Sequence, residues 1–306
     1  RSVIARNTSP DVPFDQSINP YRGCEHGCVY CFARPTHAYY GLSPGLDFET
    51  RLFHKPDAPE ILRRELSRRS YRPAVIAMGT NTDPYQPVER QQWLTRRILQ
   101  VLAEFNNPVT IVTKSALIAR DLDILGPMAA RGQASVMVSV TTLDRKLANR
   151  LEARAATPGK RLEAITALRR AGVPVGVLVA PVIPALNDWE MERILDAAVE
   201  AGAGNAGYIL LRLPHEIKDL MAEWLEVHAP DRKDHVLSLV RQARDGKLYR
   251  AEFGKRMSGS GPYADMLRQR FHLARRKRGL TGSSTPLDTG AFQVPPQAGD
   301  QLSLFR

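Results

Sequence analysis

Residues 21–34 read Tyr21-Arg22-Gly23-Cys24-Glu25-His26-Gly27-Cys28-Val29-Tyr30-Cys31-Phe32-Ala33-Arg34 and contain all three cysteines of the 306-residue chain. Thiolates are soft ligands that suit iron–sulfur clusters and zinc. Spacings of three and then two residues let one loop reach three corners of a cubane, which leaves one iron without a protein ligand. Cys24, Cys28 and Cys31 are therefore predicted to hold a [4Fe–4S] cluster with one open position.

Two alternatives remain open for these cysteines. A structural zinc site normally needs four ligands, and His26 or His37 would have to complete it because the sequence has no second cysteine pair. Three buried, unligated thiols are the other alternative, although the neighbouring glycines favour a tight loop over a core element. An odd number of cysteines within eight residues forms no disulfide framework, so we expect a reducing, cytoplasmic compartment.

Working outward from the cysteines, short β-rich apolar runs alternate with longer amphipathic stretches. This alternation is typical of βα units around a parallel sheet. Six units are fewer than the eight of a complete barrel, so we expect an α/β fold with a partial (β/α)6 barrel of the TIM type and a helical C-terminal extension. Strands are predicted at 17–20, 74–78, 109–113, 135–140, 175–179 and 208–211, and helices at 59–69, 89–105, 120–131, 160–171, 188–201, 232–244 and 263–278.

The same pattern suggests four parts of the chain. They are an N-terminal arm (1–16), the barrel (17–228), a basic helical extension (229–280) and a tail (281–306). The tail is rich in Gly, Ser, Thr, Pro and Gln as far as residue 300, and it is predicted to be flexible. The longest apolar run, 173–186, contains three prolines and is too short to span a bilayer, so no membrane association is expected.

The charge balance favours a polyanionic partner. The chain has 43 Lys and Arg against 32 Asp and Glu, a formal net charge of +11. Residues 241–280 alone hold twelve Lys and Arg and three acidic residues. Clusters of this kind mark nucleic-acid-binding surfaces, although a merely basic soluble protein is the alternative.

Polar residues follow five of the predicted strands. Because ligands bind at the carboxyl ends of parallel strands, these residues predict one site at that edge. They are Gly79-Thr80-Asn81-Thr82-Asp83, Lys114-Ser115, Ser139 with Thr141 and Thr142, and the runs 181–188 and 212–216.

The cysteine spacing, with the aromatic Tyr30 directly before the third cysteine, resembles the defining motif of the radical S-adenosylmethionine (SAM) superfamily. The resemblance implies that SAM binds the open iron of the cluster and is cleaved by one electron to methionine and a 5′-deoxyadenosyl radical, which takes hydrogen from the substrate. It also implies an electron donor such as flavodoxin or ferredoxin. In this type of chemistry the cofactor reacts and the protein positions it.

The resemblance also implies roles for particular residues. Gly79, Thr80 and Asn81 match the element that meets the SAM amino group. Lys114 and Ser139 match residues that hold the carboxylate and ribose, Arg161 is a further candidate, and Tyr30 would pack by the adenine. Ordinary polarity at strand ends and simple loop packing are the alternatives for these residues.

Much of 17–213 is similar to the spore photoproduct lyase branch, which reverses a thymine dimer in DNA. Arg22-Gly23-Cys24, the run 82–87 and the run 112–115 carry this likeness. That branch uses an additional cysteine and a tyrosine directly after the cluster motif, whereas this chain has no fourth cysteine and has Phe32 there. A phenyl ring has no O–H, so the same hydrogen relay cannot operate; Tyr39, Tyr40 and Tyr85 are candidate relays, with a structural role as the alternative.

The last residues resemble the short peptide by which bacterial DNA polymerases and repair proteins dock on the sliding clamp. Gln301 would make the polar contact, and Leu302, Leu304 and Phe305 would fill an apolar pocket. A flexible tether would raise the local concentration of the enzyme near DNA. The alternative is that the apolar end of the tail folds back on its own domain.

Taken together, these features predict a radical SAM enzyme that acts on a nucleic acid, in lyase-like DNA repair. An enzyme that modifies tRNA or rRNA is the first alternative. A non-catalytic iron–sulfur protein that binds nucleic acid is the second.

Overall fold

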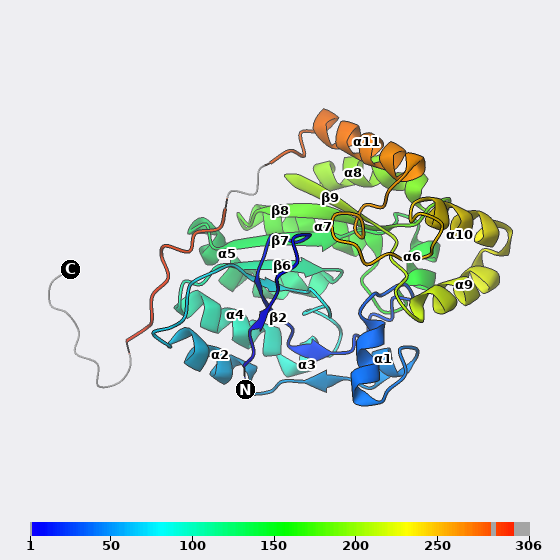
Figure 1. Cartoon of the computed structure of the whole chain (residues 1–306). Helices are drawn as coiled ribbons and strands as arrows, with labels where there is room; N and C mark the ends of the chain where they lie inside the picture. Colours follow the sequence, from blue (N-terminus) through cyan, green and yellow to red (C-terminus); the bar gives the residue numbers. More distant parts are fainter. Residues whose placement is uncertain (1, 283–285, 297–306) are drawn as a thin grey trace.

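A computed structural model describes residues 2–282 and 286–296, and its centre is a seven-stranded sheet in the order β1-β2-β5-β6-β7-β8-β9 (Figure 1). β1 pairs antiparallel with β2, and the remaining pairings from β2 to β9 are parallel. The strands are β1 Ala5–Arg6, β2 Gln16–Ile18, β3 Tyr21–Arg22, β4 Phe53–His54, β5 Ile76–Met78, β6 Val109–Thr113, β7 Ala134–Ser139, β8 Val175–Val182 and β9 Asn205–Leu210. Six parallel strands in sequence order confirm the predicted partial barrel.

Helices cover the outer face of the sheet because each turns one apolar stripe toward it. In α4, for example, Leu94, Ile98, Leu99 and Leu102 are buried at helical spacing. The helices are α1 Asp47–Thr50, α2 Ala58–Leu66, α3 Glu89–Gln92, α4 Leu94–Glu104, α5 Leu122–Ala130, α6 Arg145–Leu151, α7 Pro158–Arg170, α8 Met191–Glu200, α9 Ile217–His228, α10 Lys233–Gln242 and α11 Pro262–Lys277. Short 3-10 helices are η1 Arg34–Tyr40, η2 Ala116–Asp121, η3 Asp188–Glu190 and η4 Pro230–Arg232.

The predicted helix at 89–105 is two helices. Trp93 breaks it with a left-handed φ of 51°. The break lets the buried Glu89 accept hydrogen bonds from the backbone N–H of Thr95 (3.0 Å) and from Arg120 (2.7 Å). Neither a glycine nor a proline marks this bend in the sequence, and Arg120, the partner of Glu89, lies 31 residues away.

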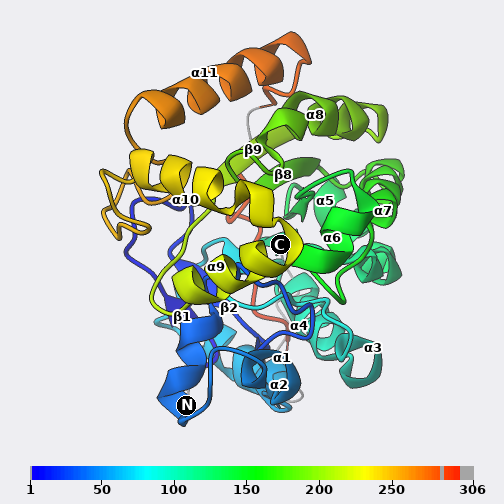
Figure 2. The ribbon, with the colours of Figure 1, turned by 90° about the vertical axis from the view of Figure 1, so that its right-hand side faces the viewer.

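α9 and α10 lie at the end of the molecule where α1 is also found, whereas α11 lies beside α8 (Figure 2). α10 packs on α9, and α11 packs on α8. Arg270 of α11 forms an ion pair with Glu192 of α8 (2.8 Å), and Arg278, directly after α11, forms one with Asp196 of α8 (2.5 Å). Part of the basic cluster therefore fastens the extension to the barrel and is not free for a polyanion.

Part of the predicted flexible tail is packed, which corrects the sequence-based expectation for 288–293. The backbone N–H of Asp288 donates to the carbonyl of Gly132 (2.9 Å), and that of Gln293 to the carbonyl of Phe105 (3.0 Å). The Phe292 ring lies 5.3 Å from the ring of Tyr71. A single aromatic residue thus anchors a polar segment along the side of the molecule opposite α1 and α9 (Figure 1).

Gln301, Leu302, Leu304 and Phe305 lie outside the described residues. Within 2–282 and 286–296, no helix combines the length and apolarity that a membrane crossing requires.

Candidate active site

The cysteine loop follows β3, and glycines with positive φ shape it at positions 23 and 27. Gly23 has φ +78°, and a Cβ there would lie 2.7 Å from the carbonyl oxygen of Phe48. The backbone N–H of Cys24 donates to that same carbonyl at 2.9 Å. A side chain at position 23 would therefore both strain the backbone and push the first cysteine away from α1.

Arg34 holds the cysteine loop through hydrogen bonds to backbone carbonyls. This arginine is 3% exposed and donates from Nε to the carbonyl of Cys28 (2.8 Å) and from Nη1 to the carbonyl of Gly45 (2.7 Å). Its Nη2 pairs with Glu49 at 3.0 Å. The guanidinium is rigid and planar and is held by Glu49 and Gly45, so its bond to the Cys28 carbonyl fixes the backbone at the second cysteine.

Gln86 ties the loop to the segment after β5. Its amide donates to the carbonyl of Gly23 (3.2 Å) and accepts from the backbone N–H of Glu25 (2.9 Å). The hydroxyl of Thr82 donates to the carbonyl of Tyr21 (3.1 Å). The run 82–87, which carried the sequence resemblance, therefore forms a wall of the cysteine site.

The three thiols are free, with Cys24 buried and the other two half-buried. Burial raises the pKa of Cys28 to about 12, an effect that the positive charge of Lys114 partly opposes. Burial also raises the pKa of Cys24 and Cys31. Such thiols become ligands when a metal centre compensates for the cost of burying their charge. Three soft donors on one loop fit an iron–sulfur cluster with an open position.

Each of the two histidines considered for a zinc site has a polar contact of its own. His26 Nδ1 lies 3.4 Å from Asp83, and His37 Nε2 lies 3.1 Å from the carbonyl of Arg51. Among the described residues, no group of three or more His, Cys, Asp and Glu side chains converges to hold a single metal ion.

Gly79, Thr80 and Asn81 stand at the carboxyl end of β5, next to the end of β2. Gly79 has φ +86°, and a Cβ would lie 1.9 Å from the carbonyl oxygen of Val112. Asn19, just after β2, donates to the Thr80 hydroxyl (3.0 Å) and accepts from the Asn81 N–H (3.1 Å). This bridge fixes the three residues beside the cysteine loop.

Lys114 presents a free ammonium to the same site. Asp83 fixes its backbone by accepting from the Lys114 N–H (2.7 Å) and from the Thr113 hydroxyl (2.7 Å). The Lys114 Nζ lies 5.8 Å from the centre of the Tyr30 ring. It forms no ion pair within the part of the chain that the structure describes. Lys114 is half-buried, and the nearby carboxylate of Glu152 is already paired with Arg161, so the ammonium suits an anionic group of a ligand.

Arg161 is placed differently from the prediction. It is 1% exposed, pairs with the buried Glu152 and donates to the carbonyls of Ala156 (2.7 Å) and Ser139 (3.1 Å). Its guanidinium is therefore engaged inside the protein, and the resemblance-based expectation of a SAM contact is corrected to a supporting role. The physical reason is that a buried Glu152 requires a cation.

Tyr30 and Ser139 frame the inner side of the site. The Tyr30 hydroxyl bonds to Glu152 and lies 3.3 Å from the Thr141 hydroxyl, so the phenol points inward. Ser139 ends β7 and is 2% exposed. Of the candidate relays, Tyr85 is fully buried in the core, whereas Tyr39 is 89% exposed on η1.

Several supporting residues gave no sequence signal of function. They are the polar residues Asn19, Arg34, Gln86 and Glu152. The partners of Asn19 and Gln86 lie far away in the sequence, whereas Arg34 and Glu152 also have nearer partners. Gln86 was inside the run that carried the resemblance, but its contact with the cysteine loop was not inferred. Only burial, which tertiary structure sets, distinguishes them from surface residues.

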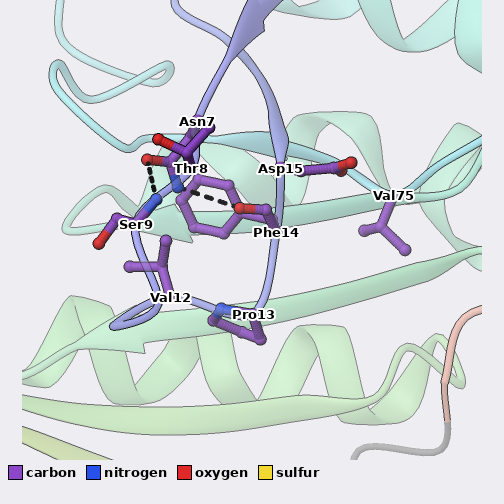
Figure 3. Close-up of a pocket in the computed structure, with 8 residues that line it drawn as sticks. All are labelled: Asn7, Thr8, Ser9, Val12, Pro13, Phe14, Asp15 and Val75. Carbon is purple, nitrogen blue, oxygen red and sulfur yellow. Dashed lines mark hydrogen bonds between the residues drawn. The ribbon is translucent and has the colours of Figure 1, made fainter. Parts of the chain in front are cut away.

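A separate pocket lies within the N-terminal hairpin (Figure 3). Asn7 organises it by donating to the carbonyl of Phe14 (3.1 Å) and accepting from the N–H of Ser9 (3.0 Å). Its lining also includes Val75, just before β5. None of the polar residues at the strand ends lines it, so it is not part of the candidate active site.

Comparisons with known proteins agree with this arrangement. Residues 18–198 match the model of the radical SAM superfamily. An uncharacterized protein of Mycobacterium tuberculosis is 38% identical over 291 residues, which are 94% of this chain and 82% of that protein. An uncharacterized protein of Acidianus two-tailed virus is 30% identical over 173 residues, or 55% of this chain and 56% of that protein.

The solved structure of spore photoproduct lyase complexed with dinucleoside spore photoproduct has the same fold. The TM-score is 0.61 over 88% of this chain and 76% of that one, and the identity is 16%. A second structure of that lyase, with bound AdoMet, gives a TM-score of 0.61 at 17% identity over 88% and 76% of the two chains. At these identities the likeness concerns the fold. The family match over most of the barrel decides the classification: this chain belongs to the radical SAM superfamily, whose enzymes use a [4Fe–4S] cluster and SAM.

Proposed function

We propose that this enzyme acts on a base of a nucleic acid, with DNA as its substrate, in a repair or modification reaction. The observation that carries the proposal is the convergence of the three-cysteine loop, the Asn19-braced Gly79–Asn81 turn and the unpaired Lys114 at one end of the parallel sheet. Ligands bind at that end in parallel α/β folds. The fold shared with spore photoproduct lyase and the positive charge of the chain support a nucleic-acid substrate.

Each part of the site has a separate task in this proposal. Cys24, Cys28 and Cys31 hold the cluster. Gly79, Thr80 and Asn81 contact the SAM amino group, Lys114 its carboxylate and Ser139 its ribose, while Tyr30 packs by the adenine. When bound, the cluster and SAM together supply a radical that removes hydrogen from the substrate. The chain itself binds, orients and shields these groups.

The lack of a fourth cysteine limits the reaction. All three cysteines of the sequence belong to the cluster loop, so no other thiol can return hydrogen to a substrate radical. Phe32 has no O–H to take part either. We therefore propose lyase-like chemistry on a nucleic acid without a protein thiol as hydrogen donor.

The basic extension supports DNA binding, although fewer of its basic residues are available than the sequence suggested. Among the described residues, Arg241, Lys247, Arg276 and Lys277 are exposed and form no ion pair. These residues remain available for phosphates after the pairs with α8 are made.

Anaerobic turnover tests the proposal. Reconstituted enzyme with SAM and a strong reductant should release methionine and 5′-deoxyadenosine, and Cys28→Ala should abolish both the cluster absorbance and the release. Duplex DNA, single-stranded DNA and tRNA are then added separately, and the recovered polymer is examined by mass spectrometry for an altered base. Change in RNA alone would favour tRNA or rRNA modification. An intact cluster without SAM cleavage would favour the non-catalytic alternative.

Two partners complete the proposal. A small electron-transfer protein such as flavodoxin or ferredoxin would reduce the cluster. The sliding clamp would bind Gln301, Leu302, Leu304 and Phe305. Binding to purified clamp by the full chain and by a chain ending at Asp300 tests the second partner, and equal binding rejects it.

A further inference from the structure

Two arginines at the carboxyl end of β9 have no carboxylate partner in the described part of the chain. Arg244 is 1% exposed, and it donates to the carbonyls of Leu211 (2.8 Å) and Arg256 (2.8 Å). Burial, and secondly the positive charge of the nearby Arg212, lower the pKa of Arg244 to about 10. The Nε atoms of both arginines are buried without a hydrogen-bond partner. Two neighbouring cations without a counter-ion are costly unless an anion joins them.

Arg212 lies beside the cysteine loop. Its guanidinium carbon is 4.7 Å from the centre of the Phe32 ring, and Phe32 directly follows Cys31. Phe32 is 41% exposed. Within the described residues, the guanidinium of Arg212 makes one hydrogen bond, from Nη1 to the sulfur of Met257 at 3.5 Å, and a thioether is a weak acceptor. Most of the donor capacity of this guanidinium is therefore unused.

The surroundings hold Arg212 in place. The backbone N–H of Leu210 donates to the carbonyl of Met257 (2.9 Å), which fastens the loop after α10 to the end of β9. Asp11 of the N-terminal arm accepts from the backbone N–H of Gly254 (2.6 Å) and pairs with Arg256. The N-terminal arm therefore fixes the loop whose Met257 contacts Arg212. The charge of Arg256 is compensated by Asp11, whereas the charge of Arg212 is not compensated by a carboxylate.

We infer that Arg212, stacked on Phe32, binds a phosphodiester of the substrate polynucleotide next to the cluster loop. A guanidinium matches the geometry of a phosphate with two parallel hydrogen bonds, and stacking on an aromatic ring preserves its orientation. The exposed part of the Phe32 ring offers a surface on which a base can stack. Arg244 is too deeply buried to contact the substrate, but its positive charge adds to the field at Arg212. The inference rests on the proposed nucleic-acid substrate.

Binding of a short fluorescent oligonucleotide to the cluster-loaded enzyme tests the inference, with a DNA and an RNA of the same sequence as separate arms. Arg212→Gln should weaken binding by about tenfold and reduce the slope of log K against log salt by about 1. Arg212→Lys should keep the charge and restore part of the affinity. Arg193→Gln is the matched control, because Arg193 also lies over an exposed aromatic ring, that of Trp189 at 5.5 Å, but on α8.

The outcomes separate this inference from the proposed function. If the unchanged enzyme binds the oligonucleotide and Arg212→Gln binds it with the same affinity and salt slope, the phosphodiester contact is wrong and the proposed function stands. If the unchanged enzyme binds neither polymer, both fail. SAM cleavage without oligonucleotide should be equal in Arg193→Gln and the unchanged enzyme. If Arg212→Gln fails to retain its cluster absorbance, Phe32→Leu and Arg212→Lys decide the question by the same two measurements.

Discussion

Arg161 and Glu152 form an ion pair with both side chains almost completely buried, at 1% and 0% exposure. Burial alone would raise the pKa of Glu152, but the charges of Arg161 and Lys114 lower it to about 2. Glu152 also accepts from the hydroxyls of Tyr30 and Thr141, the latter at 2.6 Å. This pair therefore connects α6 and α7 to the residue that precedes the third cysteine.

Removing one partner of this pair should be strongly destabilising. Glu152→Gln leaves the guanidinium of Arg161 buried without a counter-charge, which typically costs about 3–5 kcal/mol. Denaturant unfolding of the protein measures the change. Asp196→Asn is the control, because it breaks the more exposed pair with Arg278 and should cost less than about 1 kcal/mol. Equal losses in the two variants would contradict the structural role of the buried pair.

Gly79→Ala should disturb the site far more than Gly41→Ala. Both glycines have positive φ, but a Cβ at Gly79 would meet the carbonyl of Val112, whereas Gly41 has no atom within 4 Å of that position. Gly41→Ala should cost about 1–2 kcal/mol from backbone strain alone. Gly79→Ala should in addition reduce SAM binding to the cluster-loaded enzyme, measured by calorimetry. Unchanged SAM binding in Gly79→Ala would remove this turn from the proposed site.

Lys114→Met should weaken SAM binding while the cluster is retained. A hydrogen bond to a charged group contributes about 1.5–3 kcal/mol, which corresponds to about ten- to a hundredfold in affinity. Calorimetric titration with SAM measures the loss, and cluster absorbance reports on the cysteine loop. Lys146→Met, at an exposed position in α6, should bind SAM normally. Normal affinity in Lys114→Met would assign the carboxylate to another residue.

Phe292→Ala should loosen the packed part of the tail. The half-buried ring contacts Tyr71 and Phe105, so its removal should cost about 1–3 kcal/mol. Limited proteolysis should cut the segment 286–296 faster in this variant, and denaturant unfolding gives the energy. Val294→Ala, at an exposed position, serves as the control. If proteolysis proceeds at the same rate in both variants, Phe292 is not the anchor.

The local sequence was sufficient to predict the strands of the parallel sheet and the cysteine motif. β6 occupies Val109–Thr113, the same residues as the predicted strand, because a β-branched run between turn residues has one favourable conformation. The family match likewise covers the segment with the three closely spaced cysteines, whose chemistry depends on residue type and spacing. The helices α6 and α9 were not predicted. Leu151 of α6 and Trp224 of α9 belong to one buried cluster, and α9 also packs on α10, so tertiary packing stabilises these helices more than a distinct local signal does.

Tertiary structure alone decided what each polar residue near the cysteines does. Lys114 directly follows β6, and Arg161 lies in α7. Arg161 is paired with Glu152, whereas Lys114 has no ion-pair partner in the described residues. Arg212 was one of several polar residues after β9 until the structure placed it on Phe32. The physical reason is common to all three. Sequence determines which charge a residue carries, but burial and distant partners determine whether that charge is compensated within the protein or remains available to a ligand.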